Sequence, residues 1–265
     1  ILTIFACSGD GKRDIRDYYF PVEELHGGKV YEYDLAKGDS SSPEYWYFRS
    51  SRRDSGQFLV GTYYDNRFQI GQIVREKIVD NGVQVHDYFL YESDWQTGRQ
   101  IQTVAQVESP DVFPFRVQDS SGVYLFRLKY HPSFDSSTTI YIIRNRIFLG
   151  EGPGFEFQGA IYPSIRFGLR EVIGNEKEGA AEIEGRGEEW YARGLGLVYY
   201  RKSFGKSNQV AFEYRLKDIF PMSEFEKRAA VFYGDLGLLP AFHIQRIPQA
   251  VSHQIECQYR ERDGH

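Results

Sequence analysis

Apolar residues recur at every second position over short segments of this chain, and turn sequences separate the segments about every 8–12 residues. In Lys29–Leu35, for example, Tyr31, Tyr33 and Leu35 lie on one face. Alternation with a period of two directs one face of a strand toward a core and the other toward water. The expected strands are Lys29–Leu35, Tyr45–Ser50, Gln57–Tyr64, Arg67–Val79, Val83–Tyr91, Arg99–Glu108, Val123–Tyr130, Thr139–Leu149, Ser164–Ile173, Glu182–Arg193, Leu197–Phe204 and Gln209–Leu216.

The clearest hairpin signal is Asn81-Gly82, which lies between the expected strands Arg67–Val79 and Val83–Tyr91. Asn-Gly readily adopts the positive φ angles of a type I′ turn. Farther along, Pro110 is expected to stop regular strand pairing, because proline lacks the amide hydrogen that a sheet needs. The residues expected to share one face of the second strand are Val83, Val85, Phe89 and Tyr91.

The stretch Glu188–Lys202 joins two aromatic segments at Gly194 and Gly196. Glycine adopts positive φ and lets another part of the chain approach closely. We therefore expect two late strands joined by a tight turn or a bulge, with Trp190 and Tyr191 packing beside it. The stretch contains no catalytic motif, so its expected role is architectural.

Composition supports the strand pattern, because aromatic residues make up 16% of the chain and favour strands. One short helix is expected after Ser223, where Phe225 and Phe232 recur at helical spacing. These patterns predict an all-β fold with one or two short helices, in which a large antiparallel meander forms a curved sheet, half-barrel, sandwich or barrel. Residues 18–240 are expected to form a single β-rich domain, and the polar residues 241–265 a loosely packed or disordered tail.

The N-terminus resembles the end of a secretory signal peptide. Residues 1–6 are mostly apolar, and Ile4-Phe5-Ala6-Cys7 is similar to the bacterial lipobox, with an aliphatic residue three before the cysteine and a small one directly before it. On this resemblance residues 1–6 are a signal-peptide remnant, Cys7 is the lipidated N-terminus, and residues 7–17 are a flexible tether. The alternative is a first strand with a buried, free Cys7.

Cys257 is the second of the two cysteines. A Cys7–Cys257 disulfide is incompatible with lipidation of Cys7, and cysteine spacing does not decide between them. There is no Cys-x-x-Cys motif, and the six histidines are not spaced as metal ligands, so neither a metal nor another cofactor is expected.

Charge and motifs argue against several classes of function. The formal net charge is −5, which argues against a nucleic-acid partner, because phosphate backbones bind clustered lysines and arginines. Nucleophile-elbow and phosphate-loop motifs are absent. The acid pairs Glu23-Glu24 and Glu188-Glu189 are expected to be solvated carboxylates, because adjacent strand residues point to opposite faces and flank one bond poorly.

Trp46, Trp95 and Trp190 are candidate ligand-binding residues, since exposed tryptophans can form a platform that stacks on sugars. Trp95 is the best surface candidate, because it lies in a polar turn. Alternatively, the many tyrosines and phenylalanines line a cavity for a lipid or another apolar ligand.

The lipobox at Cys7 and the stretch Tyr191-Ala192-Arg193-Gly194-Leu195-Gly196-Leu197-Val198 together resemble lipoproteins of the Gram-negative cell envelope. The architecture from Tyr18 to about Phe220 is similar to the curved sheet, or half-barrel, of the lipoprotein-localisation factors. The resemblance implies a periplasm-facing or outer-membrane lipoprotein with palmitate on its N-terminus. It supplies no catalytic residues.

Three functions remain open on the sequence. The first is a non-enzymatic envelope lipoprotein that binds an apolar ligand, a lipid or a protein partner on a curved sheet and is held at the membrane by a lipid on Cys7. The second is a carbohydrate-binding surface lipoprotein. The third is a hydrolase with a dispersed site, which needs a cleft where acids and a histidine converge.

Overall fold

The alternating segments form long strands in the computed structural model, which describes residues 12–36, 42–94, 97–118, 122–177, 182–205 and 210–235. The strands are β1 Arg13–Asp14, β2 Lys29–Leu35, β3 Glu44–Arg53, β4 Gly56–Tyr64, β5 Ile70–Val79, β6 Gly82–Ser93, β7 Gln100–Pro114, β8 Arg116–Val117, β9 Val123–Tyr130, β10 Ile140–Glu151, β11 Phe155–Phe157, β12 Ala160–Tyr162, β13 Ser164–Asn175, β14 Ile183–Ala192, β15 Gly196–Phe204 and β16 Val210–Phe220. The helix α1 spans Met222–Asp235. The expected all-β class is confirmed.

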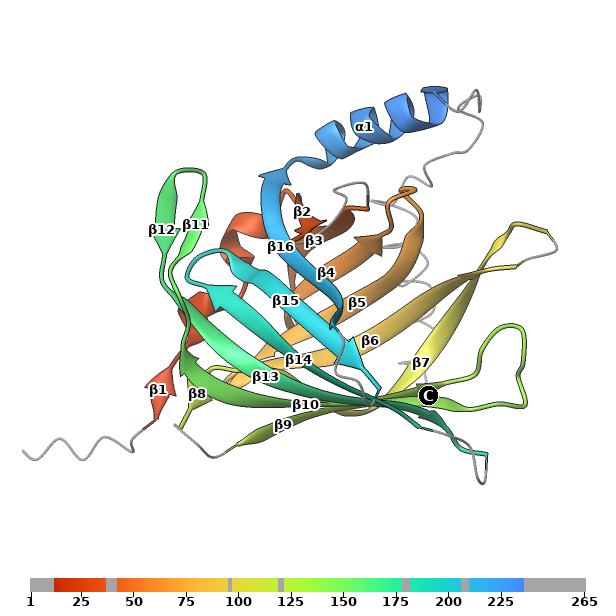
Figure 1. The fold of residues 1–265 in the computed structure, drawn as a ribbon, viewed down its shortest axis with the longest axis horizontal. Coiled ribbons are helices and arrows are strands. Elements are labelled where there is room, and N and C mark those ends of the chain that lie inside the picture. The colour runs from red at the N-terminus through yellow and green to blue at the C-terminus, as the bar shows by residue number, and fades with distance from the viewer. Residues whose placement is uncertain are drawn as a thin grey trace, which may run out of the picture. The chain divides into compact units, whose positions relative to one another are not determined.

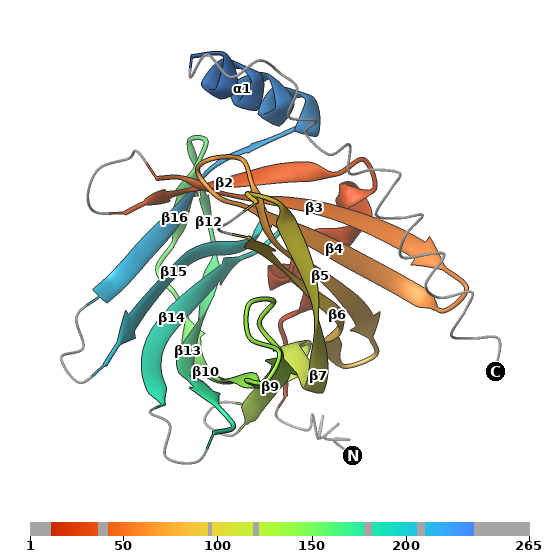
Figure 2. The ribbon, with the colours of Figure 1, turned by 90° about the vertical axis from the view of Figure 1, so that its right-hand side faces the viewer.

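Twelve of these strands pair antiparallel into a closed barrel, in the order β10-β13-β14-β15-β16-β2-β3-β4-β5-β6-β7-β9 (Figures 1 and 2). Pairing of β9 with both β7 and β10 closes the ring. Among the sheet, half-barrel, sandwich and barrel alternatives, the meander therefore adopts the barrel.

The register decides which side chains face the barrel interior, because directly opposed residues in antiparallel strands lie on the same face. Tyr31 opposes Trp46, Trp46 opposes Tyr63, and Tyr63 opposes Gln72. On the other side of the barrel, Arg144 opposes Glu171. The interior therefore combines aromatic and charged side chains.

Residues 15–25, here called the N-terminal segment, pack into the hydrophobic core of the barrel. The segment contains two short 3₁₀ helices, Arg16–Tyr18 and Val22–Leu25. Ile15 and Leu25 are fully buried, and the Ile15 amide donates to the Phe115 carbonyl at 2.8 Å.

The expected tether over residues 7–17 needs correction for its described part. Arg13 and Asp14 form β1, which pairs with β8. The ordered chain thus begins before Tyr18, because the apolar side chain of Ile15 is buried in the core. Cys7 and the signal-peptide remnant lie outside the described residues.

The hairpin at Asn81-Gly82 is present, but its turn differs from the expected type I′ geometry. Val79 pairs with Gly82, so Asp80 and Asn81 form the turn, and neither Asn81 nor Gly82 has positive φ. A Cβ on Gly82 would lie 2.5 Å from the Phe113 carbonyl oxygen. This glycine is needed for the close approach of β7 rather than for the turn.

The expectation for Pro110 is confirmed in part, and the one for the face of β6 is wrong. Pairing is irregular near Pro110, because β7 shifts register against β9 between Val107 and Ser109 and its pairing with β6 is interrupted between Ala105 and Asp111, but the strand itself continues to Pro114. Register shifts in β6 also change its phase, so that Tyr88, not Phe89, shares the interior face with Val85. A bulge adds one residue and so reverses the alternation beyond it.

Gly194 lies in the turn between β14 and β15, and Gly196 is the first residue of β15; their φ angles are 76° and 89°. The Gly194 amide donates to the Asp17 carbonyl at 2.8 Å, and a Cβ on Gly196 would lie 2.4 Å from the Phe20 ring. The turn therefore holds the N-terminal segment in its place in the core.

The chain divides into two compact units, Ile1–Phe220 and Pro221–His265. The second contains α1, while the domain boundary expected at 240 and the polar tail 241–265 lie outside the described residues. None of the helices in the described ranges has the length and apolar character needed to cross a bilayer.

We predict that Gly196→Ala destabilises the protein more than Gly194→Ala does. Both changes force alanine into positive φ, at a cost of about 1–2 kcal/mol. Only the Cβ at position 196 meets a buried ring, which adds about 1–3 kcal/mol of overpacking, whereas the one at 194 meets nothing within 4 Å. Urea unfolding monitored by tryptophan fluorescence measures both variants, and an equal loss of stability would contradict the close packing of Phe20.

Candidate functional site

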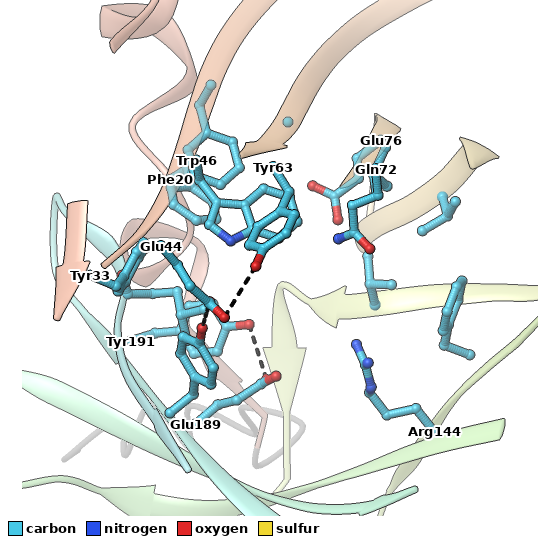
Figure 3. Close-up of a pocket in the computed structure, with 18 of the residues that line it drawn as sticks. Phe20, Tyr33, Glu44, Trp46, Tyr63, Gln72, Glu76, Arg144, Glu189 and Tyr191 are labelled. Atoms are coloured by element: carbon cyan, nitrogen blue, oxygen red, sulfur yellow. Dashed lines mark hydrogen bonds between the residues drawn. The ribbon is translucent and has the colours of Figure 1, made fainter. Parts of the chain in front are cut away.

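The barrel encloses a cavity of about 320 Å³. Twelve-stranded barrels are wider than eight-stranded ones, whose side chains just fill the interior. The cavity is lined by Phe20, Tyr33, Glu44, Trp46, Phe48, Gly61, Tyr63, Gln72, Val74, Glu76, Val85, Tyr88, Val112, Phe126, Arg144, Arg146, Glu189, Tyr191, Leu197, Tyr200, Lys202 and Phe212 (Figure 3).

One side of the cavity is an aromatic wall, formed by Phe20, Trp46, Phe48 and Tyr63. Phe20 and Phe48 have ring centroids 4.1 Å apart, and Trp46 stacks on Phe48 at 5.7 Å. Tyr63 contacts Trp46 at 5.5 Å. The N-terminal segment and the neighbouring strands β3 and β4 thus build a surface suited to an apolar ligand.

The opposite side is a charged wall, in which Arg144, Arg146, Glu189 and Lys202 line the cavity. Glu171 belongs to the same wall as the partner of Arg144 and Lys202. These residues come from four consecutive strands of the barrel, β10, β13, β14 and β15. Figure 3 shows Arg144 across the cavity from Trp46 and Tyr63. The cavity is therefore amphipathic, with apolar and ionic surfaces facing one another.

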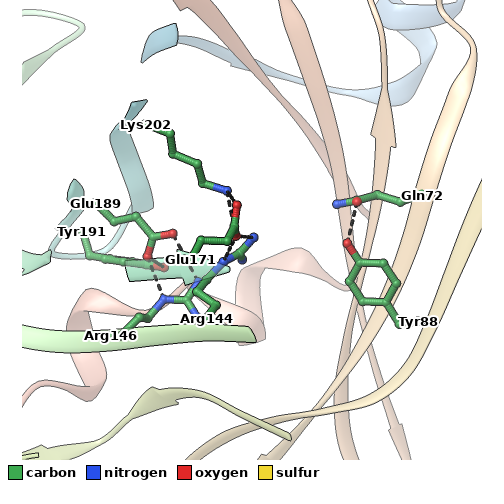
Figure 4. A network of polar contacts seen from close by, with 8 residues as sticks. All are labelled: Gln72, Tyr88, Arg144, Arg146, Glu171, Glu189, Tyr191 and Lys202. Carbon is green, nitrogen blue, oxygen red and sulfur yellow. Dashed lines mark hydrogen bonds and ion pairs between the residues drawn. The ribbon is translucent and has the colours of Figure 1, made fainter. Parts of the chain in front are cut away.

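Arg146 and Glu189 form a buried ion pair within the charged wall (Figure 4). Arg146 Nε donates to Glu189 Oε2 at 2.8 Å and Nη2 donates to Oε1 at 3.2 Å, while the Tyr191 hydroxyl donates to Oε2 at 3.1 Å. Burial alone would raise the pKa of Glu189, but the guanidinium outweighs it and lowers that pKa. Both members of the pair therefore remain charged.

Arg144 and Lys202 share a single carboxylate, Glu171 (Figure 4). Arg144 Nε and Nη2 each lie 2.6 Å from Glu171 Oε2, and Lys202 Nζ lies 3.1 and 3.2 Å from the two Glu171 oxygens. Burial would raise the pKa of Glu171, but the two cations outweigh it and lower the pKa to about 2. Burial and then the Arg144 charge lower the pKa of Lys202 to about 8.

Two further carboxylates line the cavity and are held by tyrosine hydroxyls. Glu44 accepts hydrogen bonds from Tyr200 and, at 3.3 Å, from Tyr63, while Glu76 accepts one from Tyr19 at 2.5 Å. Burial raises the pKa of both glutamates above the usual range.

The structure separates the candidate tryptophans. Trp46 lines the cavity, whereas Trp190 alternates with the inward-facing Glu189 and Tyr191 and so lies on the outer face of β14. There its indole donates to Glu188 at 2.6 Å. Trp46 and Trp190 therefore form no joint platform for sugars, and Trp95 lies outside the described residues.

Most residues of the charged wall are not among the candidates that the sequence suggested. The stretch Glu188–Lys202, expected to be only architectural, supplies Glu189, Tyr191 and Lys202 to the cavity. Glu188 and Glu189 do point to opposite faces, but Glu189 is 5% exposed and is not a solvated carboxylate. The sequence did contain one indication of these residues: a charged residue at a position that shares a face with the apolar residues of its strand.

The same signal is visible at Arg144 and Arg146, which are in phase with the buried Phe148 on β10. No histidine is among the lining residues in the described part of the chain. Within those ranges, moreover, no three His, Cys, Asp or Glu residues are grouped so that they could hold a metal ion.

We predict that Arg146→Met lowers the free energy of unfolding by about 3–5 kcal/mol, because it leaves the Glu189 charge buried without its partner. Arg201→Met is the matched control. Arg201 pairs with Glu188 at 3.0 Å but is 49% exposed, so its loss should cost about 0–1 kcal/mol. Arg146→Met/Glu189→Leu should recover much of the stability. Urea unfolding tests the series, and similar losses for the two single variants would contradict the importance of the buried pair.

Comparison with known proteins gives a fold but no family. No protein-family model matches the chain, and no curated protein matches it. A solved structure from Parabacteroides distasonis ATCC 8503, of a protein proposed to be a lipoprotein, is similar with a TM-score of 0.50 and 15% identity, covering 76% of this chain and 97% of that one. A protein from Bacteroides fragilis NCTC 9343, proposed to be exported and described as having a YmcC-like fold, gives a TM-score of 0.49 at 15% identity, with coverages of 76% and 98%. At this identity the first likeness establishes a shared β-rich fold.

Proposed function

We propose that this protein is a lipid-anchored, non-enzymatic component of the bacterial cell envelope whose barrel cavity binds an apolar ligand. The aromatic wall carries the proposal, because its packed rings also line a space of about 320 Å³ and present apolar surface to it. Pockets for small molecules typically measure about 300–1,000 Å³. The cavity lies at the lower end of this range, which favours a ligand with one hydrocarbon chain.

Binding is favoured over catalysis by the two carboxylates of the charged wall. A general acid or base works best when its pKa lies near the working pH. Arginines hold Glu171 and Glu189 and lower the pKa of both carboxyls. These groups are suited to shaping a binding site, and the dispersed hydrolase would also need a histidine beside them.

The anchor is proposed on Cys7. Its support is the lipobox resemblance of Ile4-Phe5-Ala6-Cys7, together with the lipoprotein assignment of the P. distasonis protein that shares the fold. Cys7 lies six positions before Arg13 in β1, and six extended residue steps span at most about 21 Å. An outer-membrane location and the closer likeness to lipoprotein-localisation factors belong to the same proposal.

For the anchor, we predict that radioactive palmitate labels the protein expressed from its natural gene in a Gram-negative host. Cys7→Ala should abolish the label, because the cysteine is the acceptor. Cys257→Ala is the matched control and should label normally. Equal labelling of the Cys7→Ala variant would contradict the proposed lipid anchor but would not affect the proposal that the cavity binds a ligand.

For the cavity, we predict that N-phenyl-1-naphthylamine, a neutral apolar fluorophore, binds the purified barrel with enhanced fluorescence. Val74→Trp should weaken binding at least about tenfold, or 1.4 kcal/mol, because the larger side chain fills the cavity. Val104→Trp is the control, since Val104 is 61% exposed on the same sheet. Equal binding by both variants would show that the fluorophore does not occupy the interior.

A further inference from the structure

The charged wall does not balance its charges evenly. Arg146 is matched by Glu189 alone, with two hydrogen bonds between them. Arg144 and Lys202, in contrast, share the one carboxylate of Glu171. When Lys202 is protonated, the Arg144–Glu171–Lys202 cluster therefore carries one excess positive charge.

Hydrogen-bond donors are also in excess at this cluster. A guanidinium has five N–H donors and an ammonium has three. Both contacts of Arg144 go to a single oxygen, Glu171 Oε2, and its Nη1 has no hydrogen-bond partner within the described ranges. Lys202 contacts the same carboxylate through Nζ. These donors can hold a second anion beside Glu171.

The environment strengthens such an interaction. Arg144 and Lys202 expose 24% and 16% of their side-chain surface, and Glu171 only 5%. Electrostatic attraction is stronger in this partly desolvated setting than on the open surface of a protein. An excess charge that is held away from water is costly until a counter-charge arrives.

Among the described residues, no equivalent site for a cation faces the cavity. Glu44 is already occupied by the hydroxyls of Tyr63 and Tyr200, and burial raises its pKa. Glu76 is similarly held by Tyr19. The polarity of the cavity therefore points toward an anion at the Arg144–Lys202 end.

We propose that the cavity takes a single-chain anionic amphiphile, with its carboxylate or phosphate on Arg144 and Lys202 and its hydrocarbon chain along the aromatic wall. This inference rests on the proposed function, in which the cavity holds an apolar ligand. The barrel order supports it, because β10, which carries Arg144, and β3, which carries Trp46, lie on opposite sides of the ring. One ligand can thus contact both walls at once.

The test compares ligands that share a twelve-carbon chain and differ in the head group. Dodecanoate, dodecyl phosphate, dodecanol and dodecyltrimethylammonium each displace N-phenyl-1-naphthylamine from the purified protein. We expect the two anions to bind about 10- to 100-fold more tightly than dodecanol, the range that hydrogen bonds to charged groups provide. Inorganic phosphate, added alone, should displace little fluorophore, because it lacks the chain.

Arg144→Met and Lys202→Met should each reduce the preference for dodecanoate over dodecanol at least about tenfold. Binding of dodecanol should stay within about twofold, which also shows that each variant retains a folded cavity. Arg201→Met, which removes a half-exposed arginine from the outer face, should keep the full preference.

The pH dependence supplies a second readout. Lys202 is faced by Arg144, Glu171, Glu189 and Glu44, and burial with the Arg144 charge lowers its pKa to about 8. Raising the pH from 7 to 9 removes the ammonium charge while dodecanoate stays ionised. Affinity for dodecanoate should fall about three- to tenfold in the wild type and remain constant in Lys202→Met.

The outcomes separate the two proposals. If no twelve-carbon compound displaces the fluorophore, the proposed function fails. If dodecanol binds as tightly as dodecanoate, the apolar cavity stands and the anionic head group is wrong. Tighter binding of dodecyltrimethylammonium would likewise overturn the assignment of Arg144 and Lys202.

Discussion

Closure of a twelve-stranded ring is the constraint on which the rest of the structure depends. Pairing of β9 with β7 and β10 leaves no open edge in the barrel, but it also encloses more space than strand side chains can fill. The N-terminal segment fills part of this space: Phe20 packs on Phe48, and the Tyr19 hydroxyl donates a hydrogen bond to Glu76. What remains is the cavity, so the proposed binding site follows from the number of strands.

The charges inside follow a second constraint, which is the cost of burying an ion without a partner. Arg146 and Glu189 satisfy this condition as a pair, whereas Arg144, Glu171 and Lys202 satisfy it only in part. Well-packed apolar residues would stabilise the wall as effectively. Ionic residues at these positions are therefore better explained by the ligand proposed for the cavity than by the stability of the barrel.

Local pattern predicted the strands well, because period-two alternation depends only on neighbouring residues. Lys29–Leu35 has the expected bounds of β2. The register between strands could not be predicted from the sequence, because a bulge such as the one in β6 moves every residue beyond it to the opposite face. Without the register, Arg144 and Arg146 could be placed on one face of their strand, but that face could not be assigned to the interior. The cavity itself depends on closure, which no local segment encodes.

The stretch Glu188–Lys202 shows how architecture and chemistry combine in one segment. In its turn, the Gly194 amide donates a hydrogen bond to the Asp17 carbonyl, and the Phe20 ring packs against Gly196. Its strands also carry Glu189 and Lys202, which are part of the charged wall. Phe20 in turn belongs to the aromatic wall. A shift of the turn would therefore alter both walls together, because Phe20, which packs against the turn, and Glu189 and Lys202, which lie on the adjoining strands, all face the same cavity. The glycines thus couple the position of the N-terminal segment to the geometry of the proposed binding site.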